Sequence, residues 1–143
     1  MDQLSKYLIL HNYSLGISSP IIHNVFHITL LRNSGGAFGI MRSVPGMLLF
    51  ISIAAAVVII AMMKSKSPIP KAVGIALALQ LGGALGNLID RIRLGYVIDF
   101  IDLMIWPVFN VADIAITIGV AVLAYYLIFR SHADEKPGTN QGT

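Results

Sequence analysis

Charged residues and cysteine are both scarce in this sequence. The 143 residues include ten Lys or Arg and seven Asp or Glu, together 12% of the chain, and no cysteine. An average soluble domain carries roughly 25% charged residues, so these side chains are too few to cover a water-soluble protein of this size. The absence of cysteine excludes disulfides, thiolate catalysis and cysteine-based metal sites. The net charge of +3 is too small to indicate a nucleic-acid partner.

Apolar residues dominate instead, at 56% of the chain, with a mean hydropathy of +0.77. This composition excludes a disordered or collagen-like chain and indicates an integral membrane protein. Three stretches approach the roughly 20 residues that a helix needs to cross the hydrocarbon core: 46–63, 72–89 and 111–129. Because backbone amides in lipid must be satisfied within the segment, we predict a helix for each. The length allows one domain, 1–143.

The positions of Lys and Arg orient these spans. Three lysines lie within residues 64–71, between the first two spans, and further basic residues follow the third span in a polar tail, 130–143. Short loops rich in Lys and Arg stay on the cytoplasmic side. We therefore expect the tail and the first connection to face the cytoplasm, and residues 90–110 to face the outside.

Residues 15–32 have a different pattern, because β-branched and aromatic residues follow Ser18 in rough alternation. This is typical of strands, so we predict two short strands outside the membrane. His23 and His27 lie in this region without a third ligand in a suggestive position. Neither a metal nor a cofactor is therefore expected.

The second span contains small residues at four-residue intervals: Gly74, Ala78, Gly82 and Gly86. Small residues in this pattern allow close approach of helix backbones. We predict a helix-packing face here, which would place the polar end of the span against a neighbouring helix. In that polar end Asp90 is followed directly by Arg91, which suggests an ion pair with a structural role.

Two further carboxylates are candidates for chemistry. Asp113 lies about one turn into the third span, where a carboxylate marks function by default, and Asn110 projects from the same face. Asp99 lies in the apolar, strand-like run GYVIDFID and could meet Asp113 where the loop and the helix converge. Two carboxylates in one site cannot both ionise easily, so one can act as an acid and the other as a base.

This pairing is what an aspartic peptidase needs to activate water. The pattern alone leaves a second hypothesis open. A small proton-coupled carrier or channel subunit could use Asp113 as its proton site, and it would not need Asp99.

Four sequence blocks carry a resemblance. They are DQLSK at 2–6, NSGGAFG at 33–39, GNLIDRIRLGYVIDF at 86–100 and FNVADIAI at 109–116. In this order and spacing they resemble lipoprotein signal peptidase (signal peptidase II), the intramembrane aspartic peptidase of bacteria. The resemblance covers the chain except its tail.

The resemblance implies that Asp99 and Asp113 are the catalytic residues. It further implies a set of residues that line or brace the site: Asn33, Gly35, Asn87, Asp90, Arg91, Asn110, Asp2 and Lys6. The implied reaction removes the signal peptide from bacterial prolipoproteins, before a lipobox cysteine that carries diacylglycerol. The implied place is the cytoplasmic (inner) membrane, with membrane lipid as a partner and the active site towards the extracytoplasmic face.

Two departures from the family pattern stand out. Gly36 occupies a position where the family commonly has Ala. Family members also have four spans, the first of which precedes the block that DQLSK resembles, whereas this chain starts at that block. The sequence thus predicts a polytopic helical bundle with three spans present and a small extracytoplasmic β element. We expect the true start to lie upstream of Met1 or the chain to be truncated, and a longer form to be more active.

Overall fold

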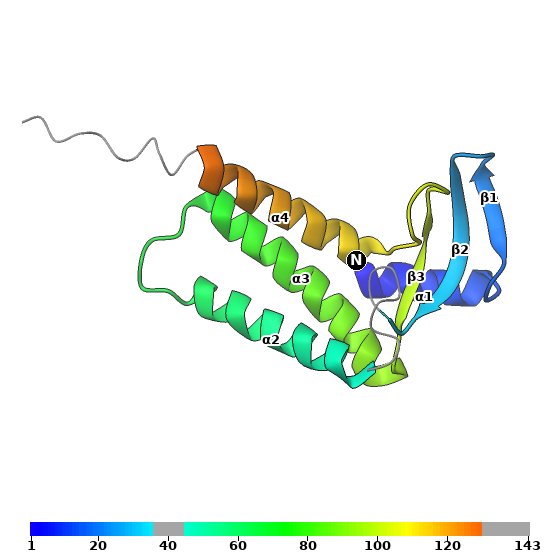
Figure 1. Cartoon of the computed structure of the whole chain (residues 1–143), viewed down its shortest axis with the longest axis horizontal. Helices are drawn as coiled ribbons and strands as arrows, with labels where there is room; N and C mark the ends of the chain where they lie inside the picture. The colour runs from blue at the N-terminus through cyan, green and yellow to red at the C-terminus, as the bar shows by residue number, and fades with distance from the viewer. Residues whose placement is uncertain (36–44, 130–143) are drawn as a thin grey trace, which may run out of the picture.

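Three long apolar helices form the body of the protein, and a small sheet lies at one end of them (Figure 1). The computed structural model describes residues 1–35 and 45–129. In chain order the elements are α1 (Asp2–Asn12), β1 (Ser18–Ile22), β2 (Phe26–Asn33), α2 (Pro45–Met63), α3 (Lys71–Leu94), β3 (Val97–Asp102) and α4 (Val111–Phe129). The fold is the mainly helical membrane fold with a small β element that the sequence predicts.

The helices α2, α3 and α4 confirm the three predicted spans. They contain 19, 24 and 19 residues, and each is long and apolar enough to cross a membrane. α3 continues past residue 89 to Leu94 and ends at Gly95, whose φ of 81° lies in the left-handed region that favours glycine. This extension places Asp90 and Arg91 inside the helix, near its end.

The three strands form an antiparallel sheet in the order β1-β2-β3. The two strands predicted within residues 15–32 are confirmed, and β3 adds the third. The buried core of the sheet consists of four apolar side chains: Ile28, Leu30, Ile98 and Phe100. Because side chains alternate between the two faces of a strand, Asp99 lies on the face opposite to its two neighbours in this core.

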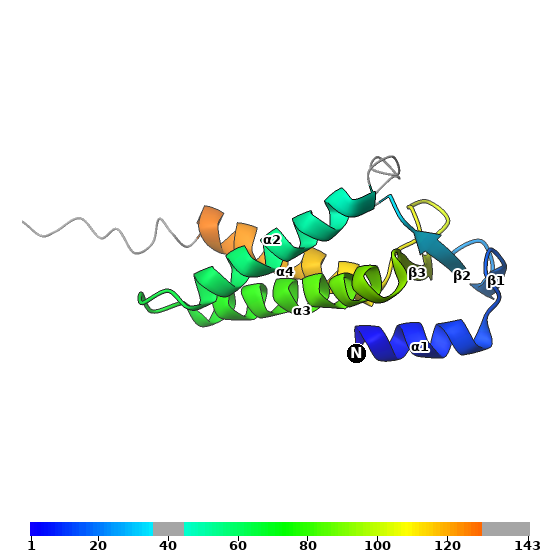
Figure 2. The ribbon, with the colours of Figure 1, turned by 90° about the horizontal axis from the view of Figure 1, so that it is seen from below.

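A short N-terminal helix, α1, connects the sheet to the helical bundle (Figure 2). Its 11 residues are too few to cross a membrane. Ile9 of α1 packs against the core of the sheet, and Gln3 donates a hydrogen bond to the carbonyl oxygen of Gly86 in α3 (3.0 Å). α1 therefore contributes polar side chains to the end of the bundle that lies next to the sheet.

The predicted packing face of α3 is wrong in part. A Cβ added to Gly83 would collide with the backbone oxygen of Ala112 in α4, whereas one added to Gly74 or Gly82 would meet nothing within 4 Å. Of the predicted stripe, Gly86 does lie in a close contact, because a Cβ added there would come within 2.6 Å of a carboxylate oxygen of Asp2. A four-residue interval rotates by about 40° per step on a helix of 3.6 residues per turn, so four such positions cannot share one narrow face.

Gly83→Ala should destabilise the protein, because the added methyl group meets a backbone oxygen that cannot rotate away. Overpacking of this kind typically costs about 1–3 kcal/mol. Gly82→Ala is the matched control, since the neighbouring position is open. Thermal unfolding in detergent should give a lower midpoint for Gly83→Ala alone. Equal midpoints for the two variants would contradict this account of the contact between α3 and α4.

Candidate active site

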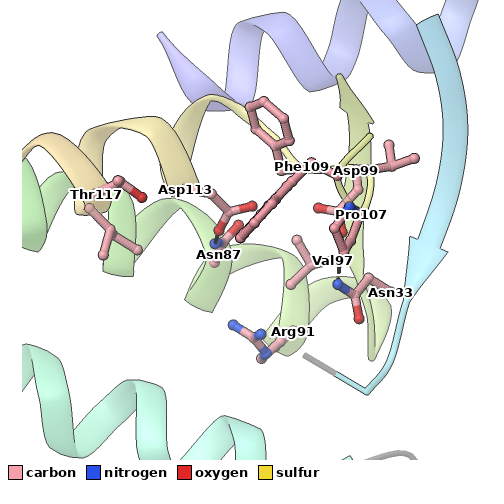
Figure 3. A pocket seen from close by; sticks show the side chains of 12 residues that line it. Asn33, Asn87, Arg91, Val97, Asp99, Pro107, Phe109, Asp113 and Thr117 are labelled. Carbon is pink, nitrogen blue, oxygen red and sulfur yellow. Dashed lines mark hydrogen bonds between the residues drawn. The ribbon is translucent and has the colours of Figure 1, made fainter. Parts of the chain in front are cut away.

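Asp99 and Asp113 line one cavity of about 290 Å³ at the end of the bundle next to the sheet (Figure 3). Asp99 comes from β3 and Asp113 from the first turn of α4. The structure thus brings the two carboxylates together, as the sequence analysis expects. Of the residues predicted around them, Asn33, Asn87 and Arg91 line the same cavity.

Asp113 is held by the start of its own helix and by α3. Its backbone N–H donates to Asn110 Oδ1 (3.0 Å), and its Oδ2 accepts from the N–H of Asn110 (3.1 Å). This reciprocal pair is a capping box with Asn and Asp in its two positions. Asn87 Nδ2 donates to the other oxygen, Oδ1, at 2.8 Å. The carboxylate also lies near the positive end of the helix dipole, which favours negative charge there.

Asp99 is the more buried of the two carboxylates, with 3% of its surface exposed. Asn33 Nδ2 donates to its Oδ2 (2.7 Å), and Asn110 Nδ2 donates to its Oδ1 (2.6 Å). Burial raises the pKa of Asp99 to about 6, and the charge of Asp113 acts in the same direction. The two amide hydrogen bonds and the charge of Lys6 oppose this shift in pKa without cancelling it. Asp99 can therefore keep a proton in mildly acidic conditions.

The amide of Asn33 is itself held in place. Its Oδ1 accepts a hydrogen bond from the backbone N–H of Gly35 (3.1 Å), a buried residue. The Nδ2 group must then face Asp99, because the acceptor end of the amide is already engaged. Gly35 thus has a bracing position, and the remainder of the NSGGAFG block, 36–39, lies outside the described residues.

Lys6 provides a buried positive charge near Asp99, with 2% of its surface exposed. Its Nζ lies 2.8 Å from Asp90 Oδ2 and 2.9 Å from Asp2 Oδ2, and it donates to Asn87 Oδ1 at 3.0 Å. An ammonium group has three donors, and each has an acceptor here. Asp2 also accepts a bond from the backbone N–H of Ala112 (3.0 Å), so α1 caps the first turn of α4.

The predicted pair between Asp90 and Arg91 is wrong. Asp90 instead contacts Lys6, accepts a hydrogen bond from Gln3 Nε2 (2.8 Å) and accepts one from the N–H of Ile98 (3.1 Å). Adjacent residues on a helix point about 100° apart, so they do not face each other. Arg91 lies on another side of α3.

Some residues of the site were missed in the sequence. Gln3 donates hydrogen bonds to two groups of α3, the carbonyl oxygen of Gly86 and the carboxylate of Asp90. Its place within the DQLSK block was the sequence feature that could have identified it. Thr117 lines the cavity one turn after Asp113, and Trp106 lines it as well. Across residues 1–35 and 45–129, no group of three His, Asp or Glu side chains is placed to hold a metal ion. The arrangement offers an acid and a base for proton transfer to and from water.

The chain is similar to known proteins along most of its length. A family model described as Signal peptidase (SPase) II matches residues 1–129. A lipoprotein signal peptidase from Moorella thermoacetica is 46% identical over 128 residues, which cover 90% of this chain and 85% of that protein. A lipoprotein signal peptidase from Brevibacillus brevis is 48% identical over 128 residues, which cover 86% of this chain and 84% of that protein.

Solved structures show the same fold. A bacterial membrane enzyme determined by the in meso method at 2.3 Å resolution superposes with a TM-score of 0.85 and 32% sequence identity. The match covers 95% of this chain and 85% of that chain. A second bacterial membrane enzyme, at 1.9 Å resolution, gives a TM-score of 0.80 and 34% identity, over 90% of this chain and 86% of the other.

Lys6→Met should destabilise the protein strongly, because the change leaves Asp2 and Asp90 without their buried cation. Removing one partner of a buried ion pair typically costs about 3–5 kcal/mol. Lys64→Met makes the same change at an exposed position after α2 and is the matched control. We expect a much lower unfolding midpoint in detergent for Lys6→Met and a nearly wild-type midpoint for Lys64→Met. A small effect of Lys6→Met would show that the ion pairs contribute little.

The buried Asp99 should make stability depend on pH. Its pKa is about 6 in the folded protein and 3.8 ordinarily. The stability that the protonated form contributes is present in full below pH 3.8 and is lost as the pH rises through about 6. The total loss is about 3 kcal/mol. Wild type should therefore lose stability relative to Asp99→Asn between pH 4 and 7, as followed by chemical unfolding. A difference that does not vary with pH would contradict the raised pKa.

Proposed function

Because the chain belongs to the signal peptidase II family, whose members remove signal peptides from prolipoproteins, we propose that it does so as an aspartic peptidase with Asp99 and Asp113 as its acid and base. The observation that carries this proposal is the shared cavity, in which asparagine side chains hold both carboxylates. Burial that keeps a proton on one of them supports it further.

In the proposed reaction Asp113 is ionised and Asp99 carries the proton. This division follows from burial, because Asp99 is buried whereas Asp113 is half-buried at the start of a helix. Asp113 removes a proton from water as the water oxygen forms a bond to the carbonyl carbon of the scissile amide. Asp99 donates its proton to the carbonyl oxygen. The C–N bond then breaks, the amine leaves with the proton that Asp113 took, and the hydroxyl proton returns to Asp99.

The surroundings of the cavity support a lipid-modified substrate. A second cavity of about 300 Å³ shares Trp106, Phe109, Asp113 and Thr117 with the first and is otherwise lined by apolar side chains. This second cavity extends along α4 from Asp113 towards the C-terminal end of the helix, since Thr117 lies one turn after Asp113. We propose that the substrate is cleaved before a lipobox cysteine carrying diacylglycerol, with the apolar groups of the substrate along this side of α4.

The charges outside the cavity support a site at the extracytoplasmic face of the bacterial inner membrane. Lys64 and Lys66 lie in the connection between α2 and α3, and Lys71 begins α3, at the end of the bundle opposite to the sheet (Figure 1). Short connections rich in lysine stay in the cytoplasm. The two carboxylates then lie at the outer boundary of the membrane, where water reaches the start of α4.

Asp99→Asn and Asp113→Asn should each abolish processing of a prolipoprotein substrate by the purified protein in lipid vesicles. An amide can neither accept a proton from water nor return it, and such a group contributes about 10²–10⁴-fold in rate. Asp102→Asn is the matched control, because Asp102 also lies on β3 but bonds Thr29 (2.6 Å) instead of facing the cavity.

We expect the control to process the substrate at the wild-type rate. Normal processing by Asp99→Asn or by Asp113→Asn would refute the proposal. If only Asp113→Asn had an effect, and that effect were on proton flux across the vesicle membrane, the carrier hypothesis would replace it.

A further inference from the structure

The loop between β3 and α4 presents apolar side chains that the described part of the chain leaves exposed. They are Leu103, Met104, Ile105 and Trp106. The side chain of Ile105 is 92% exposed, and that of Trp106 is 60% exposed. Figure 1 shows this loop between the end of β3 and the start of α4. A contiguous exposed apolar patch of this kind marks an interaction surface.

Hydrogen bonds hold this loop in shape at both of its ends. At the far end, the N–H of Phe109 donates to the carbonyl oxygen of Ile101 (3.0 Å), and the N–H of Ile101 donates back to that of Phe109 (2.8 Å). At the near end, Asp102 Oδ1 accepts from the N–H of Met104 (2.9 Å). Asp102 Oδ2 accepts from the hydroxyl of Thr29 (2.6 Å), so the sheet fixes this carboxylate. The exposure of the apolar residues is therefore built into the fold.

The backbone at Met104 has an unusual conformation. Its φ of 65° lies in the left-handed region, which residues other than glycine rarely adopt. Such a conformation persists where surrounding contacts hold it, and it often accompanies function. The bond to Asp102 is one such contact. The tight turn at Met104 places Ile105, the most exposed residue of the loop, at its tip.

The loop lies along the membrane-spanning helix α4. Leu103 and Trp106 line the apolar cavity of about 300 Å³ together with Ile114 and Ile118 of α4. Ile118 lies two turns into the helix, so the loop extends beside the first turns of this span. Residues 103–112 contain no charged side chain. The apolar surface of α4 therefore continues into the loop without interruption.

We infer that Met104 and Ile105 insert among the acyl chains of the membrane leaflet nearer to the sheet, with Trp106 at the boundary to the lipid head groups. Tryptophan favours this boundary, because its ring is apolar and its N–H is polar. Met104 and Ile105 lie outside the set of residues that line the two cavities along α4, so an occupant of those cavities would not cover them. Lipid fits better than a protein partner, because the loop continues the surface that α4 presents to lipid. The inference does not depend on the proposed function.

The fluorescence of Trp106 tests the inference without a substrate, because the chain contains one tryptophan. The full chain is placed in phosphatidylcholine nanodiscs, in which both faces of the membrane are open to solutes. Bromine atoms on the upper part of the acyl chains quench a tryptophan that they touch, and iodide quenches one that water reaches. We expect brominated lipid to remove most of the fluorescence of Trp106 and iodide to remove little of it.

Variants of Ile105 separate insertion of the loop from lipid that enters the cavity beside Trp106. Ile105→Asp places a charge among the acyl chains, where a charge is costly. Quenching by brominated lipid should therefore fall, and quenching by iodide should rise. The variant should fold, because a side chain that is 92% exposed has few packing contacts to lose. Ile105→Leu is the matched control, since it keeps an apolar side chain, and it should behave as the wild type does.

A fluorophore at the tip of the loop gives a second measurement. With Ile105→Trp combined with Trp106→Phe, brominated lipid should quench the fluorescence more than in the wild type. Strong quenching of the wild type by iodide would place the loop in water and overturn the inference. Equal quenching by brominated lipid in the wild type and in Ile105→Asp would also overturn it. Protection from both quenchers that is lost when each nanodisc holds a single chain would assign the loop to a contact with a second copy instead.

Discussion

The hydrogen bond from Asn110 Nδ2 to Asn87 Oδ1 (3.1 Å) joins the two halves of the buried polar network. On one side, Asn87 Oδ1 also accepts a bond from Lys6. On the other side, Asn87 donates to Asp113, and Asn110 donates to Asp99. Because an amide has one acceptor end and one donor end, two donors on Oδ1 leave only Nδ2 to face Asp113. The orientation of both carboxylates therefore depends on contacts that begin at the N-terminal helix.

This network is concentrated where an apolar chain can best tolerate it. Inside a membrane, unsatisfied polar groups are costly, and most of the length of α2 and α4 lacks them. The buried polar residues instead lie where α1, the end of α3, β3 and the start of α4 meet. They are Lys6, Asn87, Asp90, Asp99 and Asn110. In the proposed function, the same place gives the two carboxylates access to water and to a substrate that is partly apolar. Under this proposal, the contacts that satisfy the buried polar groups also build the site for hydrolysis.

The parts of the fold that follow local rules could be predicted from the sequence. The three spans follow from length and composition, and the strands β1 and β2 follow from the alternation of residue types. Asp113 stands out because it is a carboxylate within a span. Only the resemblance identified Asp99 as its partner with any specificity. Periodicity does not show which residue outside a helix comes to lie next to that helix in the fold.

The remaining contacts follow from no local rule. Lys6 and Asn87 are 81 residues apart and come together only through the docking of α1. Asp90 and Arg91 are adjacent in the sequence, which suggested an ion pair. Adjacent side chains on a helix point about 100° apart, so this pair does not form. The close contact of Gly83 with α4 depends in the same way on helix rotation, which a four-residue spacing of small residues does not determine.

In the proposed mechanism the two carboxylates share one proton, held on Asp99 by its burial. Infrared spectroscopy measures this directly, because a protonated carboxyl group has a carbonyl band distinct from that of a carboxylate. We expect a band from a protonated carboxyl group that titrates with a pKa of about 6, that is absent in Asp99→Asn and that persists in Asp113→Asn. A band that survives unchanged in Asp99→Asn, or the absence of any such band at pH 5, would contradict it.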